Sequence, residues 1–217
     1  MPAKPRLLVT AGPTREMLDP VRFLSNVSTG HMGYEVARTA KQMGFRVTLI
    51  SGPTALTPPR GIRYIPVLTA DDMKRAVFKC WPQADALVMT AAVCDYTPVR
   101  FSVSKIKRIK QKTIEFKRTE DILESVGKKK GTRIVVGFAL ETEAVERNAL
   151  RKLKQKNLDL IAANWYNFKN NPFGNTRTSM ILIDQKGLKK PLYRMTKREL
   201  SKAILKEVRL LLSMKRS

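Results

Sequence analysis

The segment at residues 6–33 constrains the fold of this chain more than any other part of its sequence. It opens with an apolar run, residues 6–11 (RLLVTA), that ends at Gly12 and Pro13. Such a run, bounded by turn residues, is typical of a strand that is buried on both faces of a parallel sheet. A long polar segment follows, and the apolar residues within it favour an ordered loop over a disordered one.

A helix is predicted to follow this loop, starting at His31 and stopping at Gly44. Apolar and small residues recur on one helical face, and glycine is a common helix terminator. Residues 45–51 (FRVTLIS) then form a second apolar run, closed by Gly52 and Pro53. Strand, loop, helix and strand in this order make one βαβ unit.

The rest of the chain continues this rhythm. Further strands are predicted at residues 62–67, 84–89, 134–138 and 157–163, with helices between them, and an antiparallel hairpin and a helix end the chain. Thr69 with Asp72, and Thr196 with Glu199, have the spacing of helix capping boxes. We therefore predict one Rossmann-like three-layer α/β/α domain over residues 1–217, with a mostly parallel central sheet and a C-terminal hairpin plus helix.

The charge is strongly positive, with 42 Lys and Arg against 18 Asp and Glu, a net charge of +24. Residues 100–133 interrupt the α/β pattern and are rich in lysine and arginine, so we interpret them as a basic insertion. A positive field attracts polyanions, either nucleic acid or phosphorylated small molecules. A basic solvated surface without a specific partner is the favoured explanation of the charge, so the charge alone names no function.

Other classes of protein are disfavoured. The sequence has no apolar stretch of membrane-spanning length and no signal-peptide pattern, so we expect a soluble cytoplasmic protein. Cys80 and Cys94 lack CxxC spacing, and His31 is the only histidine, so neither a zinc site nor a disulfide framework is supported.

The expected ligand site lies beyond the carboxyl ends of the strands, where open α/β sheets bind their ligands. Residues 28–33 (STGHMG) place small residues at a helix start, which favours phosphate binding. The loop after residue 89 should lie close by, with Asp95 at the mouth of the sheet. Because the first loop lacks a GxGxxG motif, a nicotinamide-dependent reductase is disfavoured.

Six motifs occur in an order that resembles the phosphopantothenoylcysteine synthetase family. They are AGPTREMLDPVRFLSNxSTGxMG from residue 11, SGPT from 51, TAAVxDY from 90, SKIKR from 104, VVGFALET from 135 and KNLDLIAAN from 156. In many bacteria this ligase is fused behind a flavin-dependent decarboxylase. No such domain is part of this sequence, so we expect a stand-alone form.

The resemblance implies a two-step ligation in coenzyme A biosynthesis. The carboxylate of 4′-phosphopantothenate attacks the α-phosphate of CTP or ATP, with CTP favoured, and the amine of cysteine then attacks the acyl nucleotide. Mg²⁺ carried with the nucleotide is the implied cofactor, and a homodimer is implied, with strands from the second half of the chain as the usual contact. A basic nucleic-acid-binding α/β protein remains the alternative.

The resemblance also implies roles for individual residues. Asn26 would hold the reacting carboxylate or acyl group, with Arg22 beside it, and Lys105 would assist formation of the acyl nucleotide. Asp95 would lie near the nucleotide and contact the metal or the ribose. The remaining nucleotide-binding residues would be Gly12, Ser28, Gly30, Ala92, Phe138, Ala139 and Asn164.

Simpler roles compete with these assignments. Taken alone, Arg22 would be better explained by a surface ion pair and Asn26 by a turn. Phe138 is consistent with plain core packing. The surrounding motifs favour the functional interpretation of Arg22 and Asn26, and they leave Phe138 open.

Overall fold

The computed structural model describes residues 3–108, 113–167 and 170–215, and a single eight-stranded sheet forms its centre. Six strands are parallel, and the last two form an antiparallel hairpin that extends one edge. Counting only the parallel strands along the chain, their spatial order is the 3-2-1-4-5-6 order of doubly wound nucleotide-binding folds. From edge to edge the strands are β5 (Arg63–Pro66), β4 (Arg46–Ser51), β1 (Arg6–Ala11), β6 (Ala86–Met89), β9 (Ile134–Glu141), β10 (Leu160–Trp165), β11 (Thr178–Asp184) and β12 (Lys189–Met195).

Helices cover both faces of this sheet. One apolar core lies between the sheet and helices α1 (His31–Gln42) and α5 (Lys197–Met214). The second lies under α2 (Ala70–Cys80), α3 (Ile122–Lys128) and α4 (Val145–Gln155). A short 3₁₀ helix, η1 (Trp81–Gln83), follows α2. The predicted three-layer α/β/α fold with a mostly parallel sheet is confirmed.

Alternating side chains explain why the inner parallel strands are largely apolar. In β1, Leu7 and Val9 belong to the core beneath α1 and α5, whereas Leu8 belongs to the core on the other face. Successive side chains of a strand point to opposite faces, so a sheet covered on both sides requires continuous apolar runs. This requirement made the strands visible in the sequence.

Both predicted capping boxes are present. Thr69 Oγ1 accepts a hydrogen bond from the Asp72 N–H, and the Asp72 carboxylate accepts one from the Thr69 N–H. Thr196 and Glu199 make the same reciprocal pair at the start of α5. Each pair satisfies backbone donors that the first helical turn leaves without intrahelical partners.

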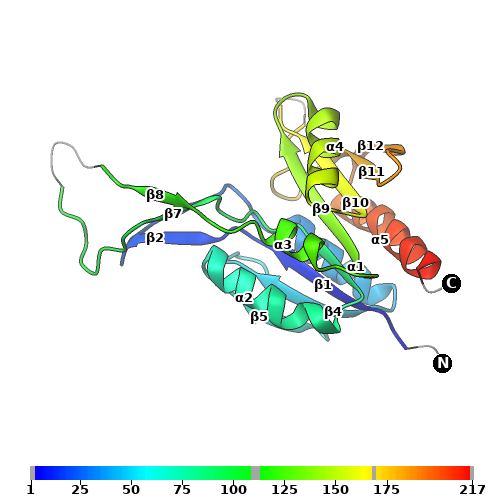
Figure 1. Cartoon of the computed structure of the whole chain (residues 1–217), viewed down its shortest axis with the longest axis horizontal. Coiled ribbons are helices and arrows are strands. Elements are labelled where there is room, and N and C mark those ends of the chain that lie inside the picture. Colours follow the sequence, from blue (N-terminus) through cyan, green and yellow to red (C-terminus); the bar gives the residue numbers. More distant parts are fainter. Residues whose placement is uncertain (1–2, 109–112, 168–169, 216–217) are drawn as a thin grey trace.

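A two-hairpin arm projects from the sheet (Figure 1). Its first hairpin pairs β2 (Arg15–Asp19) with β3 (Arg22–Ser25), and its second pairs β7 (Tyr96–Pro98) with β8 (Phe116–Arg118). The polar segment after β1, predicted as an ordered loop, therefore contains a β-hairpin. The sequence signal was weak because β2 and β3 are short and mostly polar, and they pair with each other outside the main sheet.

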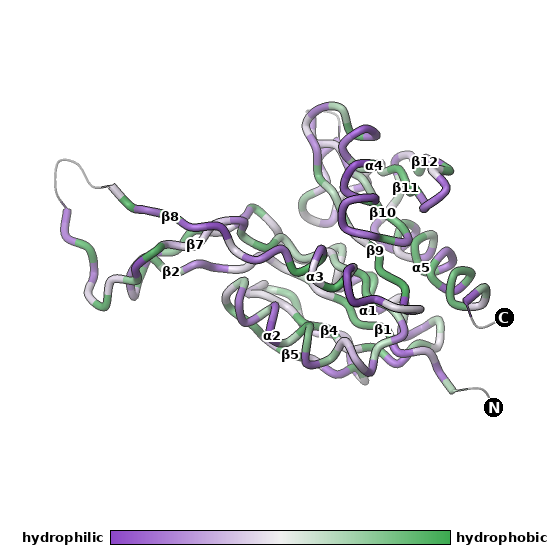
Figure 2. The backbone as a smooth tube through the Cα atoms, viewed as in Figure 1, coloured by the Kyte–Doolittle hydropathy of each residue, from purple (hydrophilic) through white to green (hydrophobic). Residues whose placement is uncertain are grey.

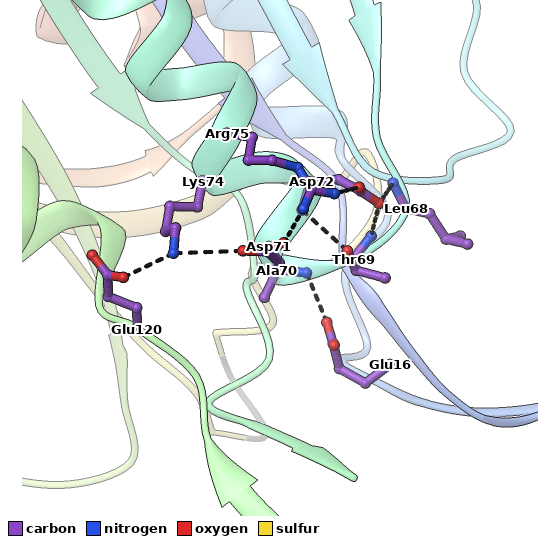
Figure 3. Close-up of polar contacts among 9 residues, drawn as sticks. All are labelled: Glu16, Leu68, Thr69, Ala70, Asp71, Asp72, Lys74, Arg75 and Glu120. Carbon is purple, nitrogen blue, oxygen red and sulfur yellow. Dashed lines mark hydrogen bonds and ion pairs between the residues drawn. The ribbon is translucent and has the colours of Figure 1, made fainter. Parts of the chain in front are cut away.

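The root of the arm is fixed against the start of α2 (Figure 3). The Glu16 carboxylate, which is buried, accepts a hydrogen bond of 2.7 Å from the Ala70 N–H in the first turn of α2. The Arg15 N–H donates to the Leu68 carbonyl at 2.8 Å. On the second hairpin's side, Lys74 of α2 forms an ion pair with Glu120 at 2.9 Å.

The predicted basic insertion is present, but its boundaries differ from 100–133. Residues beyond Asp121 return to the body as α3, whose Ile122, Leu123 and Val126 are buried in the core. Asp121 caps this helix by accepting the Glu124 N–H at 2.9 Å. The helix was missed because its two turns are too short to show a clear period. Part of the insertion, residues 109–112, lies outside the described residues.

Exposed apolar side chains occur along the arm, and the hydropathy colouring of its tube alternates between polar and apolar stretches (Figure 2). Val21 is 58% exposed and Val103 is 84% exposed. Among the described helices, none combines the length and the apolar character that crossing a membrane requires.

Candidate active site

The loops that follow β1 and β6 are joined to each other just beyond the sheet. The Ala92 N–H donates to the Gly12 carbonyl at 2.9 Å, and the Thr14 N–H donates to the Ala92 carbonyl at 3.2 Å. β1 and β6 flank the point at which the strand order reverses, where open α/β sheets bind their ligands. The expectation that these two loops meet is confirmed, and we call this region the junction, comprising residues 12–14, 26–30 and 90–95.

Helix α1 begins at the junction. Its N-cap, Gly30, has a left-handed backbone (φ 77°) and provides no side-chain cap. The Gly30 N–H donates to Ser28 Oγ at 3.4 Å. The Gly174 N–H donates to Thr29 Oγ1 at 3.2 Å, so the loop that contains Gly174 contacts this helix start. Backbone donors and the helix dipole together favour an anion here. Ser28 and Gly30 thus lie where a phosphate is favoured, and their contact with phosphate stays a prediction.

Glycines allow the close packing of the junction. A Cβ on Gly12 would lie 2.8 Å from the Gly52 carbonyl oxygen, and a Cβ on Gly33 would lie 2.4 Å from Thr90 Oγ1. Both distances are shorter than side-chain carbons tolerate. Gly33 was not among the predicted site residues, although its spacing from Gly30 (G-x-x-G) was a visible signal.

These glycines perform the tasks of the glycines in a dinucleotide-binding motif. Gly12 turns the chain at the end of β1, Gly30 opens the helix, and Gly33 brings α1 close to the sheet. The β2–β3 hairpin lies between Gly12 and Gly30 and separates them in the sequence. The absence of a contiguous GxGxxG therefore reflects an inserted hairpin and not a different kind of helix start.

Asn26 lies at the junction, directly after β3. Its amide Nδ2 donates to the carbonyls of Ala92 at 3.1 Å and Val93 at 3.2 Å, and it lies 3.9 Å from Cys94 Sγ. Of the two ends of the Asn26 amide, only the NH₂ can donate to two carbonyl oxygens, so these contacts fix the orientation of the side chain. Asn26 therefore links the end of β3 to the β6 loop through its Nδ2.

Cys94 is buried beneath Asn26. Its N–H donates to Thr14 Oγ1 at 2.9 Å, and its Sγ lies 3.5 Å from the Thr14 carbonyl oxygen. Burial is the main factor that raises the pKa of the Cys94 thiol, and the negative charges of Glu16 and Asp95 add to the effect. The sulfur therefore stays protonated at neutral pH and acts as a weak hydrogen-bond donor.

The carboxyl ends of β9 and β10 form the next part of this edge. Ala139 pairs with Ala163, and Phe138 pairs with Ala162, with Asn164 two residues further along β10. Phe138 packs against the core beneath α1, whereas Ala139 belongs to the opposite core. The two side chains thus face opposite sides of the sheet, and their shared role as nucleotide contacts stays a prediction.

Asn164 carries the clearest sign of a missing partner. Its side chain is buried, and within the described residues its Oδ1 accepts no hydrogen bond. A buried carbonyl oxygen without a donor is costly and uncommon in a native fold. An incoming ligand group that donates a hydrogen bond would satisfy it, which agrees with the role predicted for Asn164.

Asp95 is exposed at the end of the β6 loop, and its backbone carbonyl accepts the Thr119 N–H at 2.9 Å. Among residues 3–108, 113–167 and 170–215, no group of three or more His, Cys, Asp or Glu side chains is placed to hold a metal. A single carboxylate suffices for Mg²⁺ that arrives on phosphates, because Mg²⁺ keeps several waters and takes one or two protein carboxylates. Asp95 fits that limited role.

Arg22 and Lys105 lie on the arm, away from the junction. Arg22 Nη2 donates to the Ile106 carbonyl at 2.6 Å, and its Nε lies 3.3 Å from Asp19 Oδ2. β3 is extended, so Arg22 is about 13 Å along the chain from Asn26. Within this chain, the three predicted catalytic residues are therefore not in one site: Asn26 lies at the junction, whereas Arg22 and Lys105 lie on the arm. Arg22 and Lys105 instead line a basic hollow of about 580 Å³, together with Leu18, Ile106, Lys107, Arg108 and Ile114.

Asp19 organises this end of the arm. Its buried carboxylate accepts hydrogen bonds from the N–H groups of Val21, Arg22 and Ile106 at 2.9 to 3.1 Å. Burial alone would raise the pKa of this carboxyl, but the three backbone donors and the Arg22 charge outweigh it and hold the pKa below its usual value. Sequence reasoning missed Asp19, although the Asp19-Pro20 pair is a turn signal.

The sequence matches known proteins over nearly its whole length. Residues 3–211 match the family described as DNA/pantothenate metabolism flavoprotein C-terminal domain. The chain is 45% identical over 204 residues to the coenzyme A biosynthesis bifunctional protein CoaBC of Bacillus subtilis, covering 93% of this chain and 50% of that protein. It is 40% identical over 206 residues to a cysteine/cysteine sulfinic acid decarboxylase of an unknown prokaryotic organism, covering 94% of this chain and 57% of that protein.

The fold is also shared with solved structures. The C-terminal domain of a coenzyme A biosynthesis bifunctional protein CoaBC superposes with a TM-score of 0.83 at 38% identity, covering 96% of each chain. The chain spans about half the length of the curated relatives it matches. Taken together, the match over residues 3–211 and these relatives show that the chain belongs to the DNA/pantothenate metabolism flavoprotein C-terminal domain family, which confirms the resemblance of its motifs to phosphopantothenoylcysteine synthetases.

Proposed function

We propose that this protein is a ligase that joins 4′-phosphopantothenate to cysteine through an acyl-nucleotide intermediate, in coenzyme A biosynthesis in the cytoplasm. The observation that carries the proposal is the position of Asn26. Its amide bridges the β3 end to the β6 loop beside the start of α1, where an activated carboxylate and a nucleotide phosphate can meet. Family membership favours this function over the nucleic-acid-binding alternative.

In the first step, a carboxylate oxygen of phosphopantothenate attacks the α-phosphorus of the nucleotide, and pyrophosphate leaves. The N-terminus of α1 supports this step because its backbone donors and dipole stabilise phosphate charge. In the second step, the cysteine amine attacks the acyl carbon, and the nucleotide monophosphate leaves. Asn26 is suited to both steps, because a neutral amide neither gains nor loses charge while the bound group changes from an anion to a mixed anhydride and then to an amide.

Mg²⁺ is the proposed cofactor, bound mainly to the phosphates, with Asp95 as its candidate protein ligand. Mg²⁺ supplies positive charge that offsets charge developing on the phosphate oxygens. CTP is the favoured nucleotide and ATP the alternative. Asn164, through its unpartnered Oδ1, is a candidate for contact with the base or the ribose.

The direct test supplies phosphopantothenate, Mg²⁺ and either CTP or ATP, and measures pyrophosphate release. Cysteine is then added, and release of the nucleotide monophosphate is measured. We expect both releases, with the second dependent on cysteine. Folded protein that gives neither release with either nucleotide would refute the ligase proposal.

A homodimer is also proposed, and the exposed apolar side chains of the arm support it. Val21, Phe101 and Val103 are all more than half exposed, and a protein usually covers a surface of this kind. The hairpin of β11 and β12, in the second half of the chain, is the other candidate contact, and it exposes Leu188.

Two matched variants distinguish these contacts. Val103→Asp places a charge on the arm, and Leu188→Asp places the same charge on the turn of the C-terminal hairpin. We expect Val103→Asp alone to convert a dimer to a monomer by light scattering after size-exclusion chromatography. Dissociation by Leu188→Asp alone would identify the C-terminal hairpin as the contact, and a monomeric parent chain would refute the dimer.

A further inference from the structure

We infer that Thr14 is a positioning residue that holds the Asn26 amide in its working orientation. This inference rests on the proposed function for its catalytic consequence. Its structural core, the dependence of Asn26 on Thr14, can be measured separately.

The position of Asn26 is set by the β6 loop. Both strong hydrogen bonds of its Nδ2 go to backbone carbonyls, those of Ala92 and Val93. A backbone carbonyl moves only when its loop moves. Any residue that fixes the loop at Ala92 and Val93 therefore also fixes the Asn26 amide.

Thr14 fixes this loop on both sides of Val93. Its N–H donates to the Ala92 carbonyl at 3.2 Å, so Thr14 and Asn26 share one acceptor oxygen. Its Oγ1 accepts the Cys94 N–H at 2.9 Å. Thr14 thus holds the residue before and the residue after Val93.

Thr14 also holds the strand from which Asn26 emerges. Ser25, the residue before Asn26, donates its hydroxyl to the Thr14 carbonyl at 2.7 Å. Thr14 is fully buried, so these bonds are shielded from competition by water. Thr14 therefore links the end of β3 to the β6 loop, the two segments between which Asn26 lies.

A purely structural role is the competing explanation, because any buried threonine contributes to stability. The two explanations differ in what the hydroxyl does. If Thr14 positions Asn26, loss of the hydroxyl disturbs the Asn26 amide and the chemical step, while nucleotide binding at the start of α1 is largely kept. If its role is only structural, stability falls and Asn26 is not selectively affected.

The experiment compares Thr14→Val, which keeps the shape and removes the hydroxyl, with Thr14→Ser, which keeps the hydroxyl. Thr39→Val is the matched control, since Thr39 is another buried threonine, near the far end of α1, whose hydroxyl lies 3.3 Å from Glu35 Oε1. The first readout is the side-chain NH₂ signal of Asn26 in a ¹H–¹⁵N spectrum, assigned by its loss in Asn26→Asp. We expect it to shift and to exchange faster in Thr14→Val, and to stay in place in Thr14→Ser and Thr39→Val.

The second readout is ligase kinetics. A misplaced catalytic group can lower a rate up to about 100-fold, so we expect kcat of Thr14→Val to fall by about 10- to 100-fold with little change in the KM for the nucleotide. Thr14→Ser should restore kcat. If the parent chain has no ligase activity, the proposed function fails, while the Asn26 signal still decides the positioning role.

An unmoved Asn26 signal in folded Thr14→Val would overturn the inference, as would a Thr14→Ser variant that loses kcat as severely as Thr14→Val. If Thr14→Val does not fold, Ser25→Ala takes its place, because it removes the Ser25 hydroxyl bond to Thr14. We then expect a smaller shift of the same Asn26 signal. An unchanged signal in folded Ser25→Ala would overturn the inference in that case.

Discussion

The junction and the arm contain all three predicted catalytic residues, but the fold holds these two regions in different ways. At the junction, backbone hydrogen bonds and glycine contacts join β1, β6 and α1 over a buried core. The arm is held by its two hairpins, by the buried carboxylate of Asp19 and by its root at α2. The difference indicates that the junction is set by the core of the domain, whereas the arm depends on a few polar contacts.

The largest effect is expected at the junction from Gly33→Ala. Its Cβ would lie 2.4 Å from Thr90 Oγ1 and 2.5 Å from the Ala11 Cβ, so α1 must move away from the sheet. Such overpacking should cost about 3 kcal/mol of unfolding free energy, measured by urea denaturation. Gly131→Ala is the control, since Gly131 has φ 56° and open space around it, and should cost only about 1 kcal/mol. Equal losses in the two variants would show that the junction is not tightly packed.

The next largest effect is expected from Asn26→Asp. The new carboxylate would face the Ala92 and Val93 carbonyls and would repel the substrate carboxylate. We expect kcat to fall about 100-fold, equivalent to about 2.7 kcal/mol, measured as steady-state release of the nucleotide monophosphate. Asn157→Asp is the control, because the Asn157 amide also donates to a backbone carbonyl, that of Gly127, far from the junction. Unchanged turnover in Asn26→Asp would remove Asn26 from the mechanism.

In the arm, we expect a strong pH dependence that the junction lacks. The pKa of Asp19 is held below its usual value, so the ionised form stabilises the arm at pH values above about 4, and this stabilisation is lost as the pH falls through the lowered pKa. Hydrogen exchange of the Val21 and Ile106 amides should therefore accelerate, relative to intrinsic rates, below about pH 4.

Asp19→Asn should accelerate exchange of the same amides at neutral pH, because one amide cannot replace a carboxylate that accepts three N–H groups and faces Arg22. The variant should also lack the acid-dependent step of the parent chain. Protection that is the same in both proteins across the pH range would show that Asp19 does not hold the arm.

The smallest effect is expected at the root of the arm from Glu16→Ala. This change leaves the buried Ala70 N–H without its acceptor and should cost about 1.5 kcal/mol in urea denaturation. Glu16→Gln retains a carbonyl oxygen at the same place and should cost less. If the two variants lose the same stability, the hydrogen bond to α2 does not anchor the arm.

Much of the main sheet and of its covering helices was predictable, because the sequence patterns that indicate them are local. The buried strands are apolar on both faces, and each of the two capping boxes is contained within four consecutive residues. The position of ligand sites beyond strand ends also predicted correctly that the loops after β1 and β6 lie close together. The β2–β3 hairpin and α3 were missed, because they are short and are stabilised by contacts with distant segments, as Asp19 is by Ile106.

The sequence by itself determined the order of strands and helices, the doubly wound class of the fold and the family, because periodicity, caps and motifs are properties of neighbouring residues. Only the tertiary structure decided which of the predicted site residues meet. The Asn26 side chain forms a hydrogen bond to the β6 loop, more than sixty residues away in the sequence. The Arg22 side chain instead forms a hydrogen bond to the Ile106 carbonyl on the arm. Contacts between residues so far apart in sequence depend on the order of the strands in the sheet and on where the hairpins project. No local sequence pattern encodes either of these.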